Sequence, residues 1–434
     1  MKSLCASCLW LGSLLFATSA LAASPIVFRA LDLLPGATSC FANAVSNDGR
    51  VVAGYCEAPP TYAQQAVRWD PAHGVQDLGL LQGATDCQAT ALSGDGSAVF
   101  GWCNLASGKT DPFRWDAAHG IQELGLLPDT TYCYFGGSRS VSFDGSVSVG
   151  YCAYLDISSH AFRWDPVNGM QPLGALAGDA NSFASAVSAD GSVIVGESES
   201  ADFSTFEAYR WEAGSGMQNL GAPMGLPNCA AFLISADGSA AAGSCQTADG
   251  SGEEAFRWDA ANGIRSLGVP MHQSESFAAA LSDDGNVAAF GADSGDGTPQ
   301  LAFRWDATNG IASLGVLPGF ESCYPSSLSG DGALIAGDCT ESLVTPAAFL
   351  WDAQNGIRDL RDVLIGEGND LTGWQLSFDP LLTPDGRTWV GTGFHTDHDE
   401  VWVAPEAAVP RAAAAALASL ALLARRRTPA RSPA

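Results

Sequence analysis

The sequence predicts an all-β protein, a β-propeller of eight four-stranded blades. The first observation is a tryptophan that recurs at intervals of 46 to 51 residues over most of the chain. The second is a Ser/Thr-x-Asp-Gly turn in every unit, and the third is a set of four short apolar segments around it. One long repeat with such turns is typical of propeller blades and not of separate domains. The tryptophans are Trp69, Trp115, Trp164, Trp211, Trp258, Trp305, Trp351 and Trp402.

The turn defines the first two strands of each unit. Its glycine suits the left-handed position of a hairpin loop, and small or β-branched residues flank most copies. The eight copies are 46–49, 93–96, 142–145, 188–191, 235–238, 282–285, 329–332 and 383–386.

The third and fourth strands follow in each unit. A short apolar run ends in Arg-Trp-Asp, as in Ala161–Asp165, and its alternation predicts a strand. A turn closing on glycine then leads to a strand that ends in Leu-Gly, as in Asn309–Gly315.

The two ends of the repeat region predict how the ring closes. The last unit has no fourth strand, whereas Phe28–Pro35 reads as a fourth strand with no unit before it and matches Gln122–Pro128. We therefore expect the N-terminal strand to complete the last blade, which removes two unpaired edges. An open solenoid is the alternative, but it does not explain a unit divided between both ends.

Ten of the twelve cysteines occur in pairs. Four pairs are sixteen residues apart and centred on the turn aspartate, so the two members face each other across a hairpin. Units four, six and eight lack both members, and Ser182 and Ser198 stand in their places in unit four. This pattern favours disulfides over zinc, because no Cys-x-x-Cys or histidine partner accompanies the cysteines. The pairs are Cys40 and Cys56, Cys87 and Cys103, Cys133 and Cys152, Cys229 and Cys245, and Cys323 and Cys339.

The charge of the chain excludes several partners. The formal net charge is −27, and six of the 20 Lys and Arg residues lie in the leader or beyond Pro410. The body therefore sets 14 cations against 47 acids, a surface that repels nucleic acid and anionic lipid.

Both ends of the chain read as sorting signals. Residues 1–23 have the form of a signal peptide: Lys2, an apolar run Leu9–Phe16 and a small-x-small cleavage site at Ala20–Ala22. This run is too short for a membrane-spanning helix. The propeller is expected over residues 24–404, and residues 405–434 form the tail.

The tail resembles the PEP-CTERM sorting tail of Gram-negative bacteria. Pro405-Glu406 is followed by the mostly apolar Ala412–Ala424 and by Arg425–Arg427, although Ala407 replaces the second proline of the motif. The resemblance implies transient membrane anchoring, exosortase processing and a secreted or cell-surface protein. The alternative is a frayed alanine-rich helix.

The repeat itself resembles the bacterial HAF repeats, which are named for His-Ala-Phe and assigned to extracellular proteins. His160–Trp164 carries the motif, other units carry degenerate versions, and the match spans about residues 28 to 403. The strand order is also similar to that of WD repeats. Their Gly-His mark is absent, so only the architecture is shared.

Most conspicuous residues have a structural explanation. The repeating tryptophans offer sugar platforms, but eight equivalent copies favour packing between blades. An acid two places after the neighbouring arginine, in six units, favours a repeated ion pair. His395–Glu400 offers metal ligands, but their spacing matches no known metal motif, which favours a solvated loop. Asp293–Gly297 lacks the further ligands of an EF-hand calcium loop. Thr383–Trp389 resembles the sialidase Asp-box, but the hairpin turn suffices.

The irregular units are the best places for function, because loops carry function on a regular scaffold. Unit three has aromatics at Tyr132–Phe135, and unit eight has an insertion, Arg361–Phe378, that contains Trp374. These rings either bind a ligand or pack the longer loops.

No catalytic or cofactor motif was found. We therefore expect a monomeric, non-enzymatic binding or structural module without a cofactor, whose partner is an extracellular polysaccharide or a surface protein. The alternatives are a glycan hydrolase or lyase with paired carboxylates at one mouth of the ring, and a calcium-stabilised matrix protein.

Overall fold

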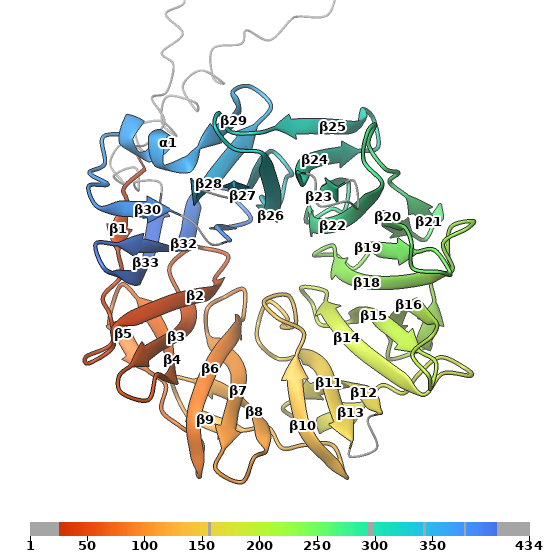
Figure 1. Ribbon diagram of the computed structural model, residues 1–434. Helices are drawn as coiled ribbons and strands as arrows, with labels where there is room; N and C mark the ends of the chain where they lie inside the picture. Colours follow the sequence, from red (N-terminus) through yellow and green to blue (C-terminus); the bar gives the residue numbers. More distant parts are fainter. Residues whose placement is uncertain (1–25, 155–157, 294–298, 342–343, 377–378, 406–434) are drawn as a thin grey trace, which may run out of the picture. The chain divides into compact units, whose positions relative to one another are not determined.

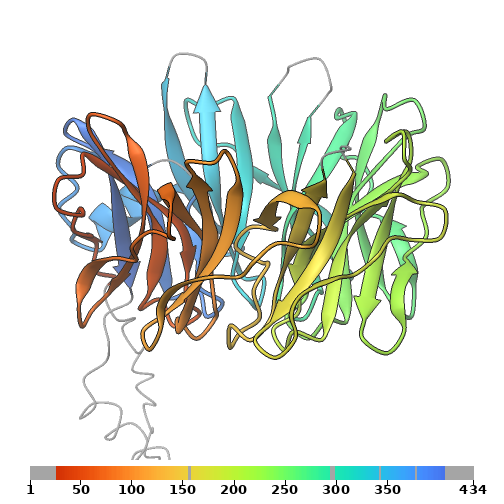
Figure 2. The same ribbon diagram turned by 90° about the horizontal axis from the view of Figure 1, so that it is seen from below.

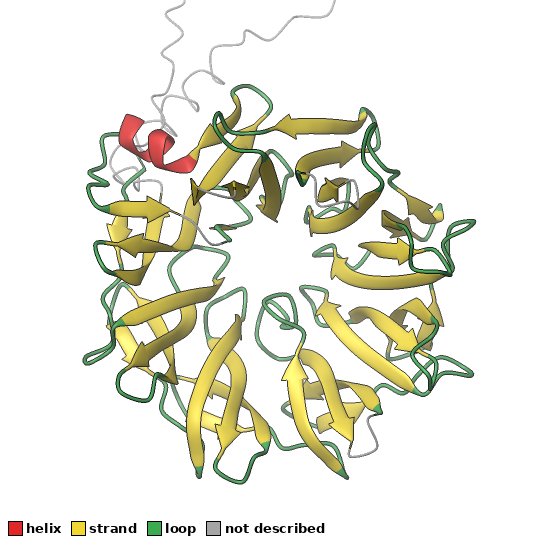
Figure 3. Ribbon diagram, in the orientation of Figure 1, coloured by secondary structure: helices red, strands yellow, loops and turns green. Residues whose placement is uncertain are grey.

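The protein is an eight-bladed β-propeller. The computed structural model describes residues 26–154, 158–293, 299–341, 344–376 and 379–405. These residues are almost all in strands or turns, with one α-helix (Figure 3). The blades follow one another around a common centre, to which the first strands of blades 1 to 7 lie closest (Figure 1), and Figure 2 shows the same ring edge-on. The predicted fold class is confirmed. The predicted leader and all of the predicted tail except Pro405 lie outside the described residues.

Blades 1 to 4 each contain four antiparallel strands. Blades 2 and 3 belong to one eight-stranded sheet, because Thr110 of β8 and Tyr132 of β10 form a parallel bridge. The strands are β2 (Ser39–Val45), β3 (Val52–Ala58), β4 (Ala63–Asp70) and β5 (Gly74–Asp77); β6 (Ala84–Leu92), β7 (Ala98–Leu105), β8 (Thr110–Asp116) and β9 (Gly120–Glu123); β10 (Thr130–Phe135), β11 (Ser148–Tyr154), β12 (Ser159–Asp165) and β13 (Gly169–Pro172); β14 (Asn181–Val187), β15 (Val193–Glu199), β16 (Phe206–Glu212) and β17 (Gly216–Asn219).

Blades 5 to 7 repeat this pattern, and blade 8 departs from it. The innermost strand of blade 8 is divided into two short pieces, β30 and β31, which both pair with β32. The strands are β18 (Asn228–Ile234), β19 (Ala240–Gln246), β20 (Glu253–Asp259) and β21 (Gly263–Ser266); β22 (Glu275–Leu281), β23 (Val287–Asp293), β24 (Leu301–Asp306) and β25 (Gly310–Gly315); β26 (Ser322–Leu328), β27 (Leu334–Glu341), β28 (Val344–Asp352) and β29 (Gly356–Asp359); β30 (Trp374–Leu376), β31 (Leu381–Leu382), β32 (Thr388–His395), β33 (His398–Pro405) and β1 (Arg29–Ala30).

The Ser/Thr-x-Asp-Gly turns join the first two strands of each blade as predicted. In blade 2, Ser93 Oγ donates to Asp95 Oδ1 at 2.7 Å and accepts the N–H of Ala98 at 2.9 Å. Gly96 has a φ of +73°, which only glycine adopts without strain. Burial opposes ionisation of Asp95, but hydrogen bonds from Ser93 and Ser97 outweigh it and lower the pKa of Asp95. The bond from the hydroxyl to the aspartate recurs in all eight turns.

The turns also bond from blade to blade. The backbone N–H of Asn47 donates to Gly94 O at 2.8 Å, and that of Ala189 donates to Ala236 O at 2.9 Å. Seven such bonds link the turns of consecutive blades. The series stops in blade 8 at Pro384, because proline has no N–H to donate toward blade 1.

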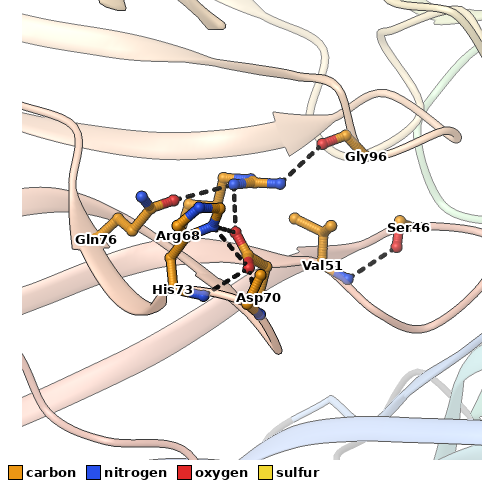
Figure 4. A network of polar contacts seen from close by, with 8 residues as sticks. Ser46, Val51, Arg68, Asp70, His73, Gln76 and Gly96 are labelled. Carbon is orange, nitrogen blue, oxygen red and sulfur yellow. Dashed lines mark hydrogen bonds and ion pairs between the residues drawn. The ribbon is translucent and has the colours of Figure 1, made fainter. Parts of the chain in front are cut away.

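A repeated arginine links neighbouring blades through their third strands (Figure 4). Arg68 donates to Asp70 Oδ2 at 2.6 Å and to Gln76 Oε1 at 3.0 Å in its own blade. Its Nη2 also donates to Gly96 O of blade 2 at 3.5 Å, and its Cζ lies 5.4 Å from the ring centroid of Trp115. The predicted ion pair between arginine and acid is confirmed in all six units. The first seven tryptophans lie in or against the hydrophobic clusters, so their packing role is confirmed too.

The eighth tryptophan corrects the prediction of eight equivalent copies. In blade 1, Gly54 of the second strand pairs with Val67, which lies two residues before the repeating tryptophan. In blade 8 the equivalent Gly391 pairs with Trp402 itself, so Ala404 occupies the tryptophan position. A Cβ on Gly391 would lie 2.6 Å from the ring of Trp402, which therefore fills the space above this glycine. The spacing could not reveal this shift, because the last interval also contains the insertion of unit eight.

The N-terminal strand closes the ring as predicted. Arg29 and Ala30 of β1 pair with Val403 and Trp402 of β33, and Leu31 N–H donates to Val401 O at 2.8 Å. Val403 occupies the position that the repeating arginine takes in six other blades, so this arginine is missing where blade 8 meets blade 1. A cavity of about 240 Å³ lies at this place, with Val403 and Arg29 in its lining.

All five predicted cysteine pairs lie at disulfide-bonding distance. In blade 4, two buried serines occupy the cysteine positions and form hydrogen bonds in place of the disulfide. Ser182 Oγ accepts the N–H of Ala161 in blade 3 at 2.9 Å, and Ser198 Oγ accepts the N–H of Leu176 at 2.9 Å. Within the described residues, no helix is long and apolar enough to cross a membrane.

Candidate functional site: an aromatic groove on blades 1 to 4

The aromatic segment of unit three divides into exposed and packed rings. Tyr132 and Tyr134 alternate along β10 with Cys133 and Phe135, so the two sets point to opposite sides of the strand. Tyr132 is 38% exposed and Tyr134 is partly exposed, whereas Phe135 is buried against Phe100 and Phe162. The packing interpretation is therefore confirmed for Phe135, whereas ligand binding by the exposed tyrosines stays a prediction.

The exposed tyrosines belong to a larger set that we call the aromatic arc. Tyr134 contacts Trp102 of blade 2 at a centroid distance of 6.1 Å, and it contacts Tyr132 at 5.3 Å. Tyr151 lies 6.0 Å from Tyr134 and 4.9 Å from Phe183 of blade 4. Five rings from three neighbouring blades therefore form one connected series, and each remains partly or well exposed. Burial, followed by the neighbouring tyrosines, raises the pKa of the Tyr151 phenol, which is uncharged at neutral pH.

A groove of about 620 Å³ adjoins the arc at Trp102. The loop after β3 supplies Tyr62, which is 60% exposed and has a φ of 53°, a conformation that costs a non-glycine residue energy. Asp86 accepts hydrogen bonds from Asn104 Nδ2 and Thr85 Oγ1, both at 2.8 Å. The groove is lined by Thr61, Tyr62, Ala63, Gln64, Thr85, Asp86, Trp102 and Asn104.

Two acids stand beyond the other end of the arc. Glu197 and Glu199 lie two residues apart on β15, and Glu197 pairs across the strands with Phe183 of the arc. Burial, followed by repulsion from Glu199, raises the pKa of Glu197 to about 7. Tyr209 lies close to this carboxyl, but its hydroxyl donates to Phe183 O at 3.0 Å.

The insertion of unit eight buries its tryptophan, although many of its other residues face solvent. It forms the helix α1 (Leu360–Gly366), whose N-cap Asp359 accepts from Arg361 N. Trp374 is 7% exposed, stacks on His395 at 4.5 Å and meets Phe28 edge-on at 5.0 Å. The packing interpretation is therefore confirmed for Trp374.

In the segment His395–Glu400 the two histidines form local hydrogen bonds with acids. His395 Nδ1 lies 3.2 Å from Glu400 Oε2, and His398 Nε2 lies 2.6 Å from Glu400 Oε1. A hydrogen bond with Asp397 is the largest cause that raises the pKa of His398. The described residues contain no group of three or more His, Cys, Asp or Glu able to hold a metal. Asp293–Gly297, the segment compared with a calcium loop, lies outside the described residues except for Asp293. Thr383–Trp389, the segment compared with the Asp-box, contains the hairpin turn of blade 8.

No family model matches the chain, and no curated protein matches it. Solved propellers do resemble it. The Dos1 propeller has a TM-score of 0.52 at 11% identity, over 88% of this chain and 95% of that chain. A structure from an analysis of two prolyl endopeptidases has a TM-score of 0.53 at 11% identity, over 86% of this chain and 55% of that chain. An oligogalacturonate lyase in complex with manganese has a TM-score of 0.48 at 14% identity, over 82% of this chain and 97% of that chain. At such identities the likeness defines the class, a β-propeller, and nothing finer.

Sequence reasoning found only part of this site. It selected Tyr132 and Tyr134, but it missed Tyr62, Trp102 and Asp86. A signal was present, because an aromatic residue lies between the glycine and the cysteine of the second strand in units one to three. Its meaning depends on which rings meet across blades, and only the tertiary structure shows that.

Proposed function

We propose that this protein is an exported, non-enzymatic binding module for extracellular polysaccharide, and that the aromatic arc and its groove bind the sugar. The observation that supports the proposal is the series of partly exposed rings from Trp102 to Phe183. Exposed aromatic groups gathered on adjoining elements mark binding surfaces more often than scattered ones do. Such rings offer flat apolar faces to the C–H groups of a sugar, and the tyrosine hydroxyls add hydrogen bonds.

The groove suits this role in size and chemistry. Its volume of about 620 Å³ falls within the roughly 300–1,000 Å³ that is usual for ligand sites. Gln64, Asn104 and Asp86 supply amide and carboxylate groups for sugar hydroxyls. A surface protein is the alternative partner, and it would bind to the same exposed rings.

Export is part of the proposal. The resemblance of the repeat to HAF repeats, of residues 1–23 to a signal peptide and of residues 405–434 to a PEP-CTERM tail supports it. The five cysteine pairs at disulfide distance are consistent with an oxidising compartment. Cell fractionation of a Gram-negative host tests this proposal: we expect disulfide-bonded protein at the surface or in the medium, and reduced protein in the cytoplasm would contradict it.

A glycan array with the oxidised full-length protein tests the binding proposal. We expect retained glycans to lose binding in Trp102→Ala and in Tyr62→Ala, the second of which removes a well-exposed ring and leaves the fold intact. Phe394→Ala is the matched control, because Phe394 is 37% exposed and lies outside the arc in blade 8. Absence of glycan binding, or equal loss in the control, would contradict the proposal.

A glycan hydrolase or lyase is the second candidate, and Glu197 is the observation that favours it. A carboxyl with a pKa of about 7 beside a second acid suits general acid–base chemistry. Product analysis of glycans incubated with the protein and with Glu197→Gln separates the two functions. Cleavage that Glu197→Gln abolishes would favour the enzyme.

A further inference from the structure

The charges around the groove distinguish between kinds of sugar. Asp86 is the single ionisable acid in its lining, and no lysine, arginine or histidine of the described chain lines it. The two hydrogen bonds that Asp86 accepts, one to each carboxylate oxygen, leave lone pairs available for a ligand. A second acid borders the site, because Gln64 Nε2 donates to Glu57 Oε1 at 3.4 Å.

The aromatic groups of the groove favour the same sign of charge. Tyr62 and Trp102 line the groove together with Asp86. Aromatic faces attract cations, with Trp the most effective, and the attraction adds to that of a nearby carboxylate. A group that stacks on these rings while it carries a positive charge therefore gains from both contacts.

The rest of the molecule strengthens this preference. The body has 14 cations against 47 acids, so a cationic ligand is drawn toward it and a uronate is repelled. Lys109, in the loop after β7, does not line the groove, although its neighbour Thr110 donates to Asn104 Oδ1 at 3.1 Å.

We propose that the groove between blades 1 and 2 selects sugars that carry a protonated amino group, with the ammonium at Asp86 and the ring against Tyr62 and Trp102. This inference rests on the proposed glycan-binding function. It narrows the ligand class to polysaccharides that contain non-acetylated hexosamine. Neutral sugars can use the same rings, but they lack the ionic contact.

The test compares three oligosaccharides of equal length and the same β-1,4 linkage: glucosamine, N-acetylglucosamine and glucose. Calorimetry with the oxidised full-length protein, at low salt and mildly acidic pH, measures each affinity. We expect the glucosamine oligomer to bind about tenfold more tightly than the other two, and the advantage to fall as salt screens it. Asp86→Asn should remove this preference, so that the glucosamine oligomer binds no more tightly than the two uncharged oligomers.

Asp77→Asn is the matched control, because Asp77 is an exposed acid at the end of β5 that does not line the groove. Equal affinity for the three oligomers would overturn the inference while leaving glycan binding intact. Tighter binding of a galacturonate oligomer, or an equal effect of the two variants, would overturn it as well. Failure to bind any sugar would overturn both this inference and the proposed function.

Discussion

Replacing Ser93 with alanine tests the role of the repeated turn in stability. Ser93 is fully buried, and its hydroxyl both donates to Asp95 and accepts the N–H of Ala98. Alanine removes a hydrogen bond to a charged acceptor and leaves a buried donor without its side-chain partner. Each loss costs about 1–3 kcal/mol in proteins, so we expect Ser93→Ala to lower the free energy of unfolding by about 2–6 kcal/mol. Equilibrium urea denaturation, followed by tryptophan fluorescence with the disulfides intact, measures it.

Two further measurements make this prediction specific. Ser97→Ala is the control, because it removes only an exposed hydroxyl that also bonds to Asp95, and the backbone N–H of residue 97 that bonds to Asp95 is retained. The folded pKa of Asp95 is lowered, so its contribution is present above the unfolded pKa and is lost as pH falls through the folded pKa. The difference between wild type and Ser93→Ala should therefore shrink in strong acid. A loss below about 0.5 kcal/mol, or one equal to that of Ser97→Ala, would refute the reasoning.

Three other changes test the site and the scaffold. Burial raises the pKa of Glu197 from 4.5 to about 7, so the folded state binds a proton more tightly than the unfolded state. Stability should therefore fall by about 3 kcal/mol between these pH values relative to Glu197→Gln, and parallel pH profiles in denaturation would contradict this. Replacing Cys87 and Cys103 with serine should cost about 3 kcal/mol in the same assay, since they close a loop at a separation of 16 residues; an unchanged midpoint would count against the pairing. Gly54→Ala should destabilise by about 3 kcal/mol or prevent folding, because its Cβ would lie 1.9 Å from a backbone oxygen, whereas Gly214→Ala, with no atom within 4 Å, should behave as wild type.

The sequence predicted the blade because each blade depends on local chemistry that repeats. The turn bonds join residues at most five apart, and the pair between arginine and acid joins residues two apart. Cysteines sixteen apart across a known turn identify their own partners. Even the split blade followed from a count of strands, and β1 pairs with β33 as predicted.

The last blade shows where such counting fails. The spacing placed Trp402 with the other seven tryptophans, but its strand is shifted by two residues and Ala404 takes the repeating position. A two-residue shift keeps the same side chains on the same face, so the alternation of polar and apolar residues does not reveal it. Trp402 lies opposite Gly391, the position that Phe113 and Phe162 take opposite the equivalent glycines of their own blades.

For the candidate site, too, the sequence predicted one part and the tertiary structure revealed the other. The sequence located Tyr132 and Tyr134 because unit three is irregular. It could not show that Trp102 reaches them from another blade, since that contact joins residues more than thirty apart.

The sequence by itself determined the number of blades, the chemistry of each turn, the disulfide partners and the strand that closes the ring, because short-range bonds and repeated spacing carry that information. Only the tertiary structure decided the register of blade 8 and the meeting of Tyr62, Trp102 and Asp86 in one groove. Those features depend on how neighbouring blades pack, and side chains from separate repeats become neighbours only when the ring has formed.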